Sequence, residues 1–121
     1  MKKILVCDDD LVSLSIVCTK LKNENFGEII KATDGMQGID FVNENHFDLI
    51  ITDLQMPLKT GLDLSLHVRK VQKKDTPIII LSSEGQEDVV LEAFEIGVND
   101  FVTKPFSIKE LIDKAKKLLY D

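Results

Sequence analysis

The chain has 121 residues, of which 44% are hydrophobic and 30% are charged, and its formal net charge is -6. A chain of this length and composition folds as one domain without needing a disulfide or a metal for stability. The acidic balance argues against a surface for nucleic acids or anionic membranes, which needs clustered Lys and Arg. No segment fits a signal peptide or a membrane span, so we expect a cytoplasmic protein.

The first half of the chain alternates short apolar runs with segments of helical spacing. These patterns predict, in order, a strand over residues 2–7, a helix over 11–21, a strand over 28–32, a helix that begins at Asp34-Gly35, and a strand that ends at Asp53. Three aspartates, Asp8, Asp9 and Asp10, directly follow the first strand. The third strand is almost entirely apolar before Asp53, which is typical of a strand buried on both faces.

The second half continues the alternation, with a helix over about 62–71, a strand over 78–81, a helix that stops at Gly97, a strand over 101–103 and a helix from 108 to the end. Ser83 with Gln86 and Ser107 with Glu110 predict capping boxes for the last two helices. The predicted buried face of the fourth helix consists of Val89, Val90, Ala93, Phe94 and Ile96. We expect a single domain over residues 1–121, with no output domain.

Five strands alternating with five helices predict a parallel sheet covered by helices on both faces, an α/β doubly wound fold. The chemically distinctive side chains all follow the carboxyl ends of strands. If strands one and three are neighbours, these side chains converge on one crevice. They are Asp8, Asp9, Asp53, Ser82 and Lys104.

Three carboxylates in one crevice require a counter-charge. At about 5 Å each pair repels by roughly 3 kcal/mol at an effective dielectric of 20. Lys104 offsets part of this repulsion, and a Mg²⁺ ion with oxygen ligands fits the remainder. A carboxylate beside Mg²⁺ can accept a phosphoryl group, with Asp53 as nucleophile and Lys104 and Ser82 facing the phosphoryl oxygens. The competing interpretation is that Asp8, Asp9 and Asp10 only cap the first helix.

The order and content of these motifs resemble the receiver domain of two-component response regulators, in particular the CheY-like single-domain regulators. The resemblance covers the whole chain and implies the flavodoxin-like strand order 2-1-3-4-5. It is carried by four segments, Ile4 to Asp9, Ile50 to Pro57, Ile80 to Ser83 and Phe101 to Phe106.

The resemblance implies a Mg²⁺-dependent phosphoryl transfer from a histidine kinase to Asp53. The implied metal ligands are Asp9, Asp53 and the backbone carbonyl of Gln55, with Asp8 acting through water. It further implies that the Lys104-Pro105 peptide bond is cis. The protein would then be a signalling switch that catalyses only its own phosphorylation and dephosphorylation.

Other residues receive their roles only from this resemblance. Ser82 and Phe101 occupy the switch positions, and Phe101 stands where the family more often has Tyr. Gln55 and Glu84 flank the phosphoryl group and tune the access of hydrolytic water. The output surface would comprise the fourth helix, the fifth strand and the fifth helix.

Partners follow from the same resemblance. They are a histidine kinase and a downstream effector, with a phosphatase as a further candidate. The fourth helix is acidic, so an effector that binds it has a basic contact surface.

Two other functions remain open from the sequence. The run of aspartates also fits a phosphatase of the haloacid dehalogenase type, with Asp8 as nucleophile and Asp10 as acid. A receiver-like binding module that is never phosphorylated would share the fold and the partner surface.

Overall fold

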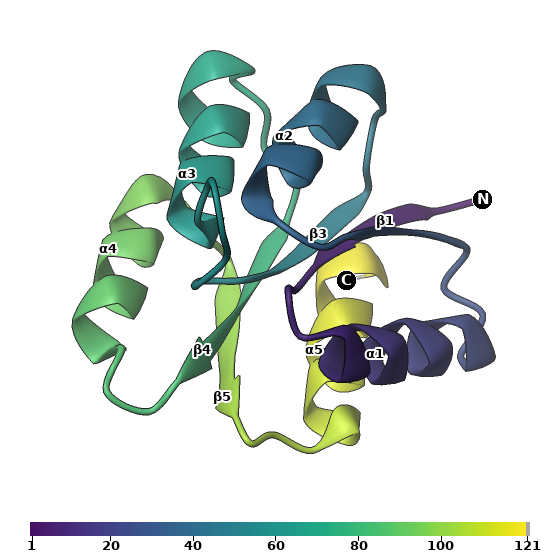
Figure 1. Ribbon diagram of the computed structural model, residues 1–121. Helices are drawn as coiled ribbons and strands as arrows, with labels where there is room; N and C mark the ends of the chain where they lie inside the picture. Colours follow the sequence, from purple (N-terminus) through teal and green to yellow (C-terminus); the bar gives the residue numbers. More distant parts are fainter. Residues whose placement is uncertain (121) are drawn as a thin grey trace.

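The computed structural model describes residues 1–120, in which strands and helices alternate along the chain (Figure 1). The strands are β1 (Lys3–Cys7), β2 (Glu28–Ala32), β3 (Leu49–Asp53), β4 (Ile78–Ser83) and β5 (Asp100–Lys104). The helices are α1 (Leu11–Asn23), α2 (Gly35–Glu44), α3 (Gly61–Leu66), α4 (Glu87–Ile96) and α5 (Ile108–Tyr120), and a π-helical segment, η1 (His67–Val71), continues α3. No helix in the described part is both long and apolar enough to cross a membrane.

The five strands form one parallel sheet in the order β2-β1-β3-β4-β5, which confirms the expected flavodoxin-like topology. Strands β1 and β3 are therefore neighbours, and Cys7 pairs with Thr52 in the register. The residues that follow Cys7 and Thr52 lie side by side at the same edge of the sheet. This edge is the switch point of the topology, where open α/β sheets form a crevice.

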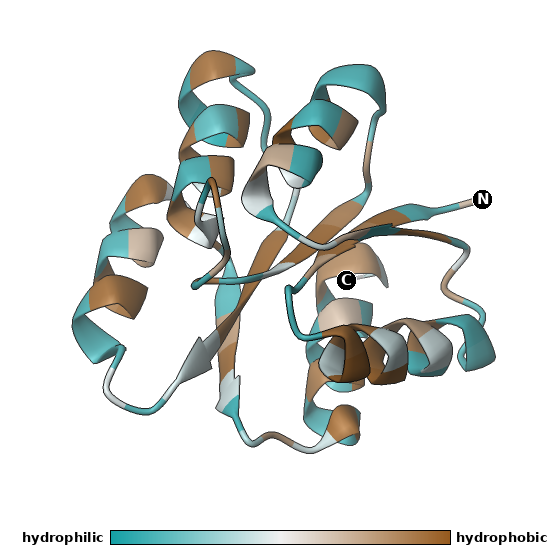
Figure 2. Ribbon diagram, in the orientation of Figure 1, coloured by the Kyte–Doolittle hydropathy of each residue, from teal (hydrophilic) through white to brown (hydrophobic). Residues whose placement is uncertain are grey.

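Helices cover both faces of the sheet, and nearly every residue of the central strands is therefore buried. On one face Ile4 and Val6 pack with residues of α1 and α5. On the other face Leu5 and Ile50 pack with residues of α2, α3 and α4. Figure 2 shows mainly hydrophobic strands at the centre of the molecule, and helices on which hydrophobic and hydrophilic segments alternate.

The start of α4 differs from the predicted capping box. The helix begins at Glu87, and the side chain of Gln86, its N-cap, makes no capping hydrogen bond. Gln86 instead accepts a hydrogen bond from the backbone N–H of Ser83 at 2.6 Å, within the turn that precedes the helix. Gly85 has a φ of 86°, so the chain turns sharply here and the helix cannot begin at Ser83.

The buried face of α4 is also narrower than the periodicity predicted. Val90 and Ala93 are buried, whereas Phe94 is 40% exposed. One half of the second predicted capping box is present, because Ser107 accepts a hydrogen bond from the N–H of Glu110 at 3.1 Å. Among the described residues, the Glu110 side chain makes no return bond to the N–H of Ser107. The cap of α4 could not be derived in the same way, since its turn depends on the left-handed Gly85.

Candidate functional site

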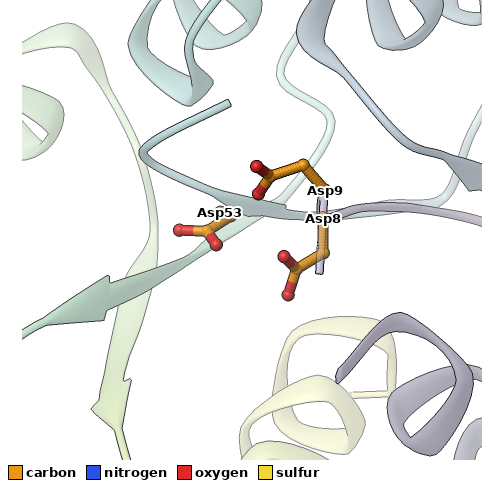
Figure 3. A group of neighbouring side chains, drawn as sticks. All are labelled: Asp8, Asp9 and Asp53. Carbon is orange, nitrogen blue, oxygen red and sulfur yellow. The ribbon is translucent and has the colours of Figure 1, made fainter. Parts of the chain in front are cut away.

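Three carboxylates meet where β1 and β3 end. One ligand oxygen from each of Asp8, Asp9 and Asp53 lies within 4.8 Å of the others. Figure 3 shows Asp8 and Asp9 at the end of β1, beside Asp53 at the end of β3. Asp8 is 1% exposed and Asp53 is 8% exposed, whereas Asp9 reaches solvent. The predicted convergence of these residues is therefore present.

Lys104 supplies a positive charge to this cluster from the end of β5. Its Nζ atom lies 3.0 Å from Asp8 Oδ2 and 2.9 Å from Asp53 Oδ2, so it donates to both carboxylates. The peptide bond between Lys104 and Pro105 is cis, as the sequence resemblance implied. One ammonium group thus joins the ends of three strands.

Burial and charge act in opposite directions on Asp53. Burial of the carboxyl group raises its pKa above the ordinary value, the ammonium of Lys104 lowers it, and the carboxylate of Asp8 raises it again. The net result is a raised pKa, so Lys104 only partly offsets burial and the second acid. Conversely, the two carboxylates raise the pKa of Lys104 against the effect of its burial. Burial is thus the main reason that protonation of Asp53 is favoured, and Lys104 is the one cation among the described residues that contacts both buried carboxylates.

Helix capping accounts for only one of the three consecutive aspartates. Asp10 Oδ1 accepts hydrogen bonds from the N–H groups of Val12 and Ser13 at the start of α1. Asp8 Oδ1 accepts from the N–H of Asp10, which orients Asp8 and leaves its other oxygen for Lys104. Asp10 is the helix cap, and Asp8 and Asp9 belong to the acidic cluster.

The loop after β3 returns to pack closely against the backbone of Asp53. A Cβ atom on Gly61 would lie 2.2 Å from the carbonyl oxygen of Asp53, which leaves space only for glycine. Thr60 and Asp63 form a capping box that begins α3 directly after this loop. Asp53 Oδ1 accepts a 3.4 Å hydrogen bond from the N–H of Gln55. These contacts fix the end of β3 relative to α3.

Ser82 is buried at the end of β4, but its hydroxyl faces β5. It lies 3.2 Å from the hydroxyl of Thr103 and 3.4 Å from the carbonyl oxygen of Val102. Among the described residues it makes no hydrogen bond to Asp53. The structure thus brings Ser82 to the predicted edge of the sheet, while its hydroxyl is bonded away from the carboxylates. Thr103 is not among the predicted site residues, although it lies opposite Ser82 in the strand register.

Phe101 lies half-buried on the outer side of β5. Its ring packs edge-to-face against Phe94, with centroids 5.8 Å apart, and the ammonium of Lys114 lies 5.3 Å from its centroid. Lys114 also pairs with Asp100 at 3.1 Å. A cavity of about 270 Å³ lies beside the ring, under α4, and is lined by Ser82, Thr103, Val90, Leu91, Phe94 and Phe101, among others. The Phe101 ring therefore borders an open space into which a side chain can move.

Gln55 and Glu84 lie on the loops after β3 and β4, and both are exposed. Within residues 1–120 neither side chain makes a hydrogen bond. They remain candidates for tuning positions, with no contact that orients them.

The acidic cluster fits a divalent cation by its chemistry. Its side-chain donors are all carboxylate oxygens, the ligands that Mg²⁺ prefers. Lys104 occupies one oxygen each of Asp8 and Asp53, which leaves their second oxygens and Asp9 as potential ligands. Asp8, Asp9 and Asp53 can therefore hold a metal.

Residues 4–116 match the response regulator receiver domain as a protein family. The chain belongs to this family. Receiver domains accept phosphoryl groups from histidine kinases and act on downstream effectors, and bound Mg²⁺ is typical of them.

Relatives and solved structures agree with this family. The chain is 33% identical to the chemotaxis protein CheY of Pseudomonas aeruginosa over 96% of this chain and 94% of CheY. It spans about half the length of other curated relatives, which are transcriptional regulatory proteins. The Francisella response regulator 1452 receiver domain matches with a TM-score of 0.87 and 36% identity, over 98% of this chain and 97% of that one.

A third match shows the same fold at lower identity. It is the receiver domain of the sensor histidine kinase PA1611 from Pseudomonas aeruginosa, with a TM-score of 0.87 and 21% identity, over 99% of this chain and 98% of that one. That structure has a magnesium ion coordinated in its active site cleft.

Proposed function

We propose that this receiver domain is a phosphorylation-dependent signalling switch in which Asp53 is the phosphoacceptor. The observation that carries the proposal is the contact of Lys104 with both Asp53 and Asp8 at 2.9 and 3.0 Å. This arrangement concentrates negative charge around one acceptor carboxylate and holds a cation beside it. Phosphoryl transfer depends mainly on such positioning and charge neutralisation.

The transfer takes place from a phosphohistidine of the kinase. An Asp53 carboxylate oxygen forms the new bond to phosphorus, the phosphorus–nitrogen bond breaks, and its electron pair stays on the histidine nitrogen. Asp53 Oδ2 already accepts a hydrogen bond from Lys104, whereas Oδ1 accepts only the long bond from Gln55. One of these oxygens attacks the phosphorus, and the other remains available to the metal ion. Lys104 then faces an oxygen of the bound phosphoryl group.

Asp9 and Asp53, with the backbone carbonyl of Gln55, hold Mg²⁺ in this proposal, and Asp8 contacts it through water. When bound, Mg²⁺ neutralises phosphoryl charge. The all-oxygen donor set supports this assignment, as does the magnesium ion in the PA1611 receiver domain, which has the same fold. Three carboxylates face the single ammonium of Lys104, and this excess of negative charge supports a divalent ion over none.

Phosphorylation is read out through Ser82 and Phe101. In the proposed switch, the Ser82 hydroxyl turns toward the phosphoryl group, and the Phe101 ring moves into the cavity under α4. The buried position of Ser82 beside β5 and the 270 Å³ cavity next to Phe101 support this coupling. Each movement changes the surface formed by α4, β5 and α5.

The effector binds that surface in the proposal, and its contact surface is basic. Helix α4 and the turn before it present a row of acidic side chains together with the exposed apolar residues Leu91 and Phe94. The acidic residues are Glu84, Glu87, Asp88, Glu92 and Glu95. A peptide with apolar anchors and flanking Lys or Arg complements this combination.

Intact-mass analysis after incubation with a small phosphodonor and Mg²⁺ tests the proposal. We expect one phosphoryl adduct on the wild-type chain. The adduct is absent from Asp53→Asn and from wild type treated with chelator, while Asp10→Asn, which changes only the cap of α1, retains it. An adduct that persists in Asp53→Asn would reject Asp53 as the acceptor.

Gln55 and Glu84 are proposed to control hydrolysis of the acyl phosphate. Both are exposed on loops at the sheet edge that carries Asp53, which supports access of their side chains to the attacking water. We expect Gln55→Ala and Glu84→Ala to change the decay rate of the adduct more than the rate at which it forms. Unchanged decay in both variants would remove them from the site.

The structure does not favour the phosphatase alternative, because Asp10 is engaged elsewhere. In that reaction Asp10 would act as the acid beside an Asp8 nucleophile. Asp10 Oδ1 instead accepts two hydrogen bonds at the start of α1, and Asp8 is paired with Lys104. The cluster is better arranged for phosphorylation of Asp53.

A further inference from the structure

Thr103 is the closest hydrogen-bond partner of Ser82. The two residues are a cross-strand pair in the register of β4 and β5, and their hydroxyl oxygens lie 3.2 Å apart. The second bond of Ser82, to the carbonyl of Val102, is longer at 3.4 Å. Both side chains line the cavity under α4, so they lie on the same face of the sheet. Ser82 is therefore held toward β5 chiefly by Thr103.

We propose that the Thr103 hydroxyl is a positioning group that holds Ser82 in its resting orientation and so sets how readily the switch responds to Asp53. This inference rests on the proposed function, in which Ser82 turns toward the phosphoryl group. Ser82 cannot keep its bond to Thr103 when it makes that turn. Each molecule that switches must therefore give up the contact between the two hydroxyls.

The two hydroxyls differ in burial, and this difference determines what is lost when Ser82 turns away from Thr103. Ser82 is only 2% exposed, so in the resting orientation its hydroxyl depends mainly on β5 for its hydrogen bonds. Thr103 is only partly buried, and its hydroxyl can bond to water when Ser82 leaves. Switching thus gives up the Thr103 contact and the longer bond to Val102, and the Thr103 hydroxyl is not left unsatisfied.

The length of the contact sets the size of the effect. Hydroxyl–hydroxyl bonds are typically 2.7–2.8 Å, so a 3.2 Å contact lies at the weak end of the range. We expect its removal to shift the equilibrium between the two orientations by about two- to fivefold. An ordinary strand-forming Thr with no such role would give no shift.

Valine and serine at position 103 separate the hydroxyl from the shape of the side chain. Thr103→Val keeps the branched shape and removes the hydroxyl, whereas Thr103→Ser keeps the hydroxyl. The probe is beryllofluoride with Mg²⁺, a phosphoryl analogue whose binding to the full chain is followed by fluorine NMR. We expect about two- to fivefold tighter binding by Thr103→Val and wild-type binding by Thr103→Ser.

A double-mutant cycle tests whether the effect passes through Ser82. In the Ser82→Ala background, Thr103→Val should no longer change the affinity for beryllofluoride. Weaker or unchanged binding by Thr103→Val, or an equal gain in the Ser82→Ala background, would overturn the inference. If wild type itself neither binds beryllofluoride nor accepts a phosphoryl group, the proposed function fails instead.

Discussion

Single residues show how the site tolerates two buried carboxylates. Asp8 and Asp53 are almost inaccessible to solvent, and Lys104 contacts both. A buried ion pair gives little net stability, but removing one partner leaves an uncompensated charge that is costly. Lys104 is therefore needed for the fold as well as for the proposed transfer.

We expect Lys104→Met to lower the free energy of unfolding by about 2–3 kcal/mol. This is below the usual cost of breaking a fully buried pair, because the Lys104 side chain is 24% exposed. Urea denaturation at pH 7 measures the loss. Lys109→Met is the matched control, since Lys109 pairs with Asp113 on the surface and should show no measurable change. Equal stability of the two variants would contradict the prediction.

Whereas Lys104 stabilises the fold, the ionised carboxylate of Asp53 should destabilise it. Its pKa is raised in the folded protein, chiefly by burial, so folding favours the protonated form. The stabilisation from Asp53 is complete below the unfolded pKa of about 3.9 and is lost as the pH rises through the higher folded value. At pH 7 the ionised group therefore destabilises the fold.

We accordingly expect Asp53→Asn to be more stable than wild type at pH 7, by on the order of 1 kcal/mol. The difference should vanish when the pH is lowered to about 3, where Asp53 is protonated in both states. Urea unfolding of both proteins at several pH values measures this dependence. A difference that grows toward low pH would have the wrong sign.

At the scale of elements, Arg69 ties the π-helical segment η1 to the connection between α4 and β5. Its guanidinium group donates to the carbonyl oxygens of Gly97 and Lys74 and to the side chain of Asn99, at 2.9–3.1 Å. Gly97 ends α4 with a φ of 116°, in the left-handed region. Asn99 also accepts a hydrogen bond from the N–H of Ile78, at the start of β4. One side chain thus connects three elements.

We expect Arg69→Lys to cost about 1–3 kcal/mol, because an ammonium group cannot make three bonds with the planar geometry of a guanidinium. Thermal unfolding measures the cost. The adjacent Lys70 is exposed, so Lys70→Arg should leave the stability within about 0.5 kcal/mol of wild type. A loss of similar size in both variants would show that the network of Arg69 is not responsible.

For the whole molecule, a ligand that binds only the folded state stabilises the fold. The acidic cluster joins two loops that are far apart in sequence, and it exists only when β1 and β3 are paired. The proposed binding of Mg²⁺ would therefore be coupled to global folding.

We expect Mg²⁺ at a hundred times its dissociation constant to raise the free energy of unfolding by about 2.7 kcal/mol. Thermal unfolding with increasing MgCl₂ measures the gain, with NaCl of equal ionic strength as the control for screening. Asp9→Asn should lose most of this gain, because Asp9 is an exposed proposed ligand whose loss leaves the core intact. An equal response to NaCl would contradict specific binding.

The alternation of apolar runs and helical spacing determined the fold and its acidic edge. Asp8, Asp9, Asp53 and Lys104 lie at strand ends, and parallel strands bring such ends together whatever their separation in sequence. Local patterns could therefore predict both the architecture and the carboxylates with their cation. The end of α4 at Gly97 was also predictable, because a glycine that adopts a left-handed conformation is a common local signal for the end of a helix.

Only the tertiary structure decided how the side chains at that edge are bonded. The hydroxyl of Ser82 faces Thr103 because β4 and β5 pair in one particular register. Likewise Asp10 alone caps α1, and α4 starts after the turn at Gly85 rather than at Ser83. The Ser82–Thr103 contact joins residues 21 positions apart, and Asp8 pairs with Lys104 across 96 positions, so periodicity carries no information about either. The turn at Gly85 is local, but it depends on a left-handed backbone conformation that the hydrophobic pattern does not encode.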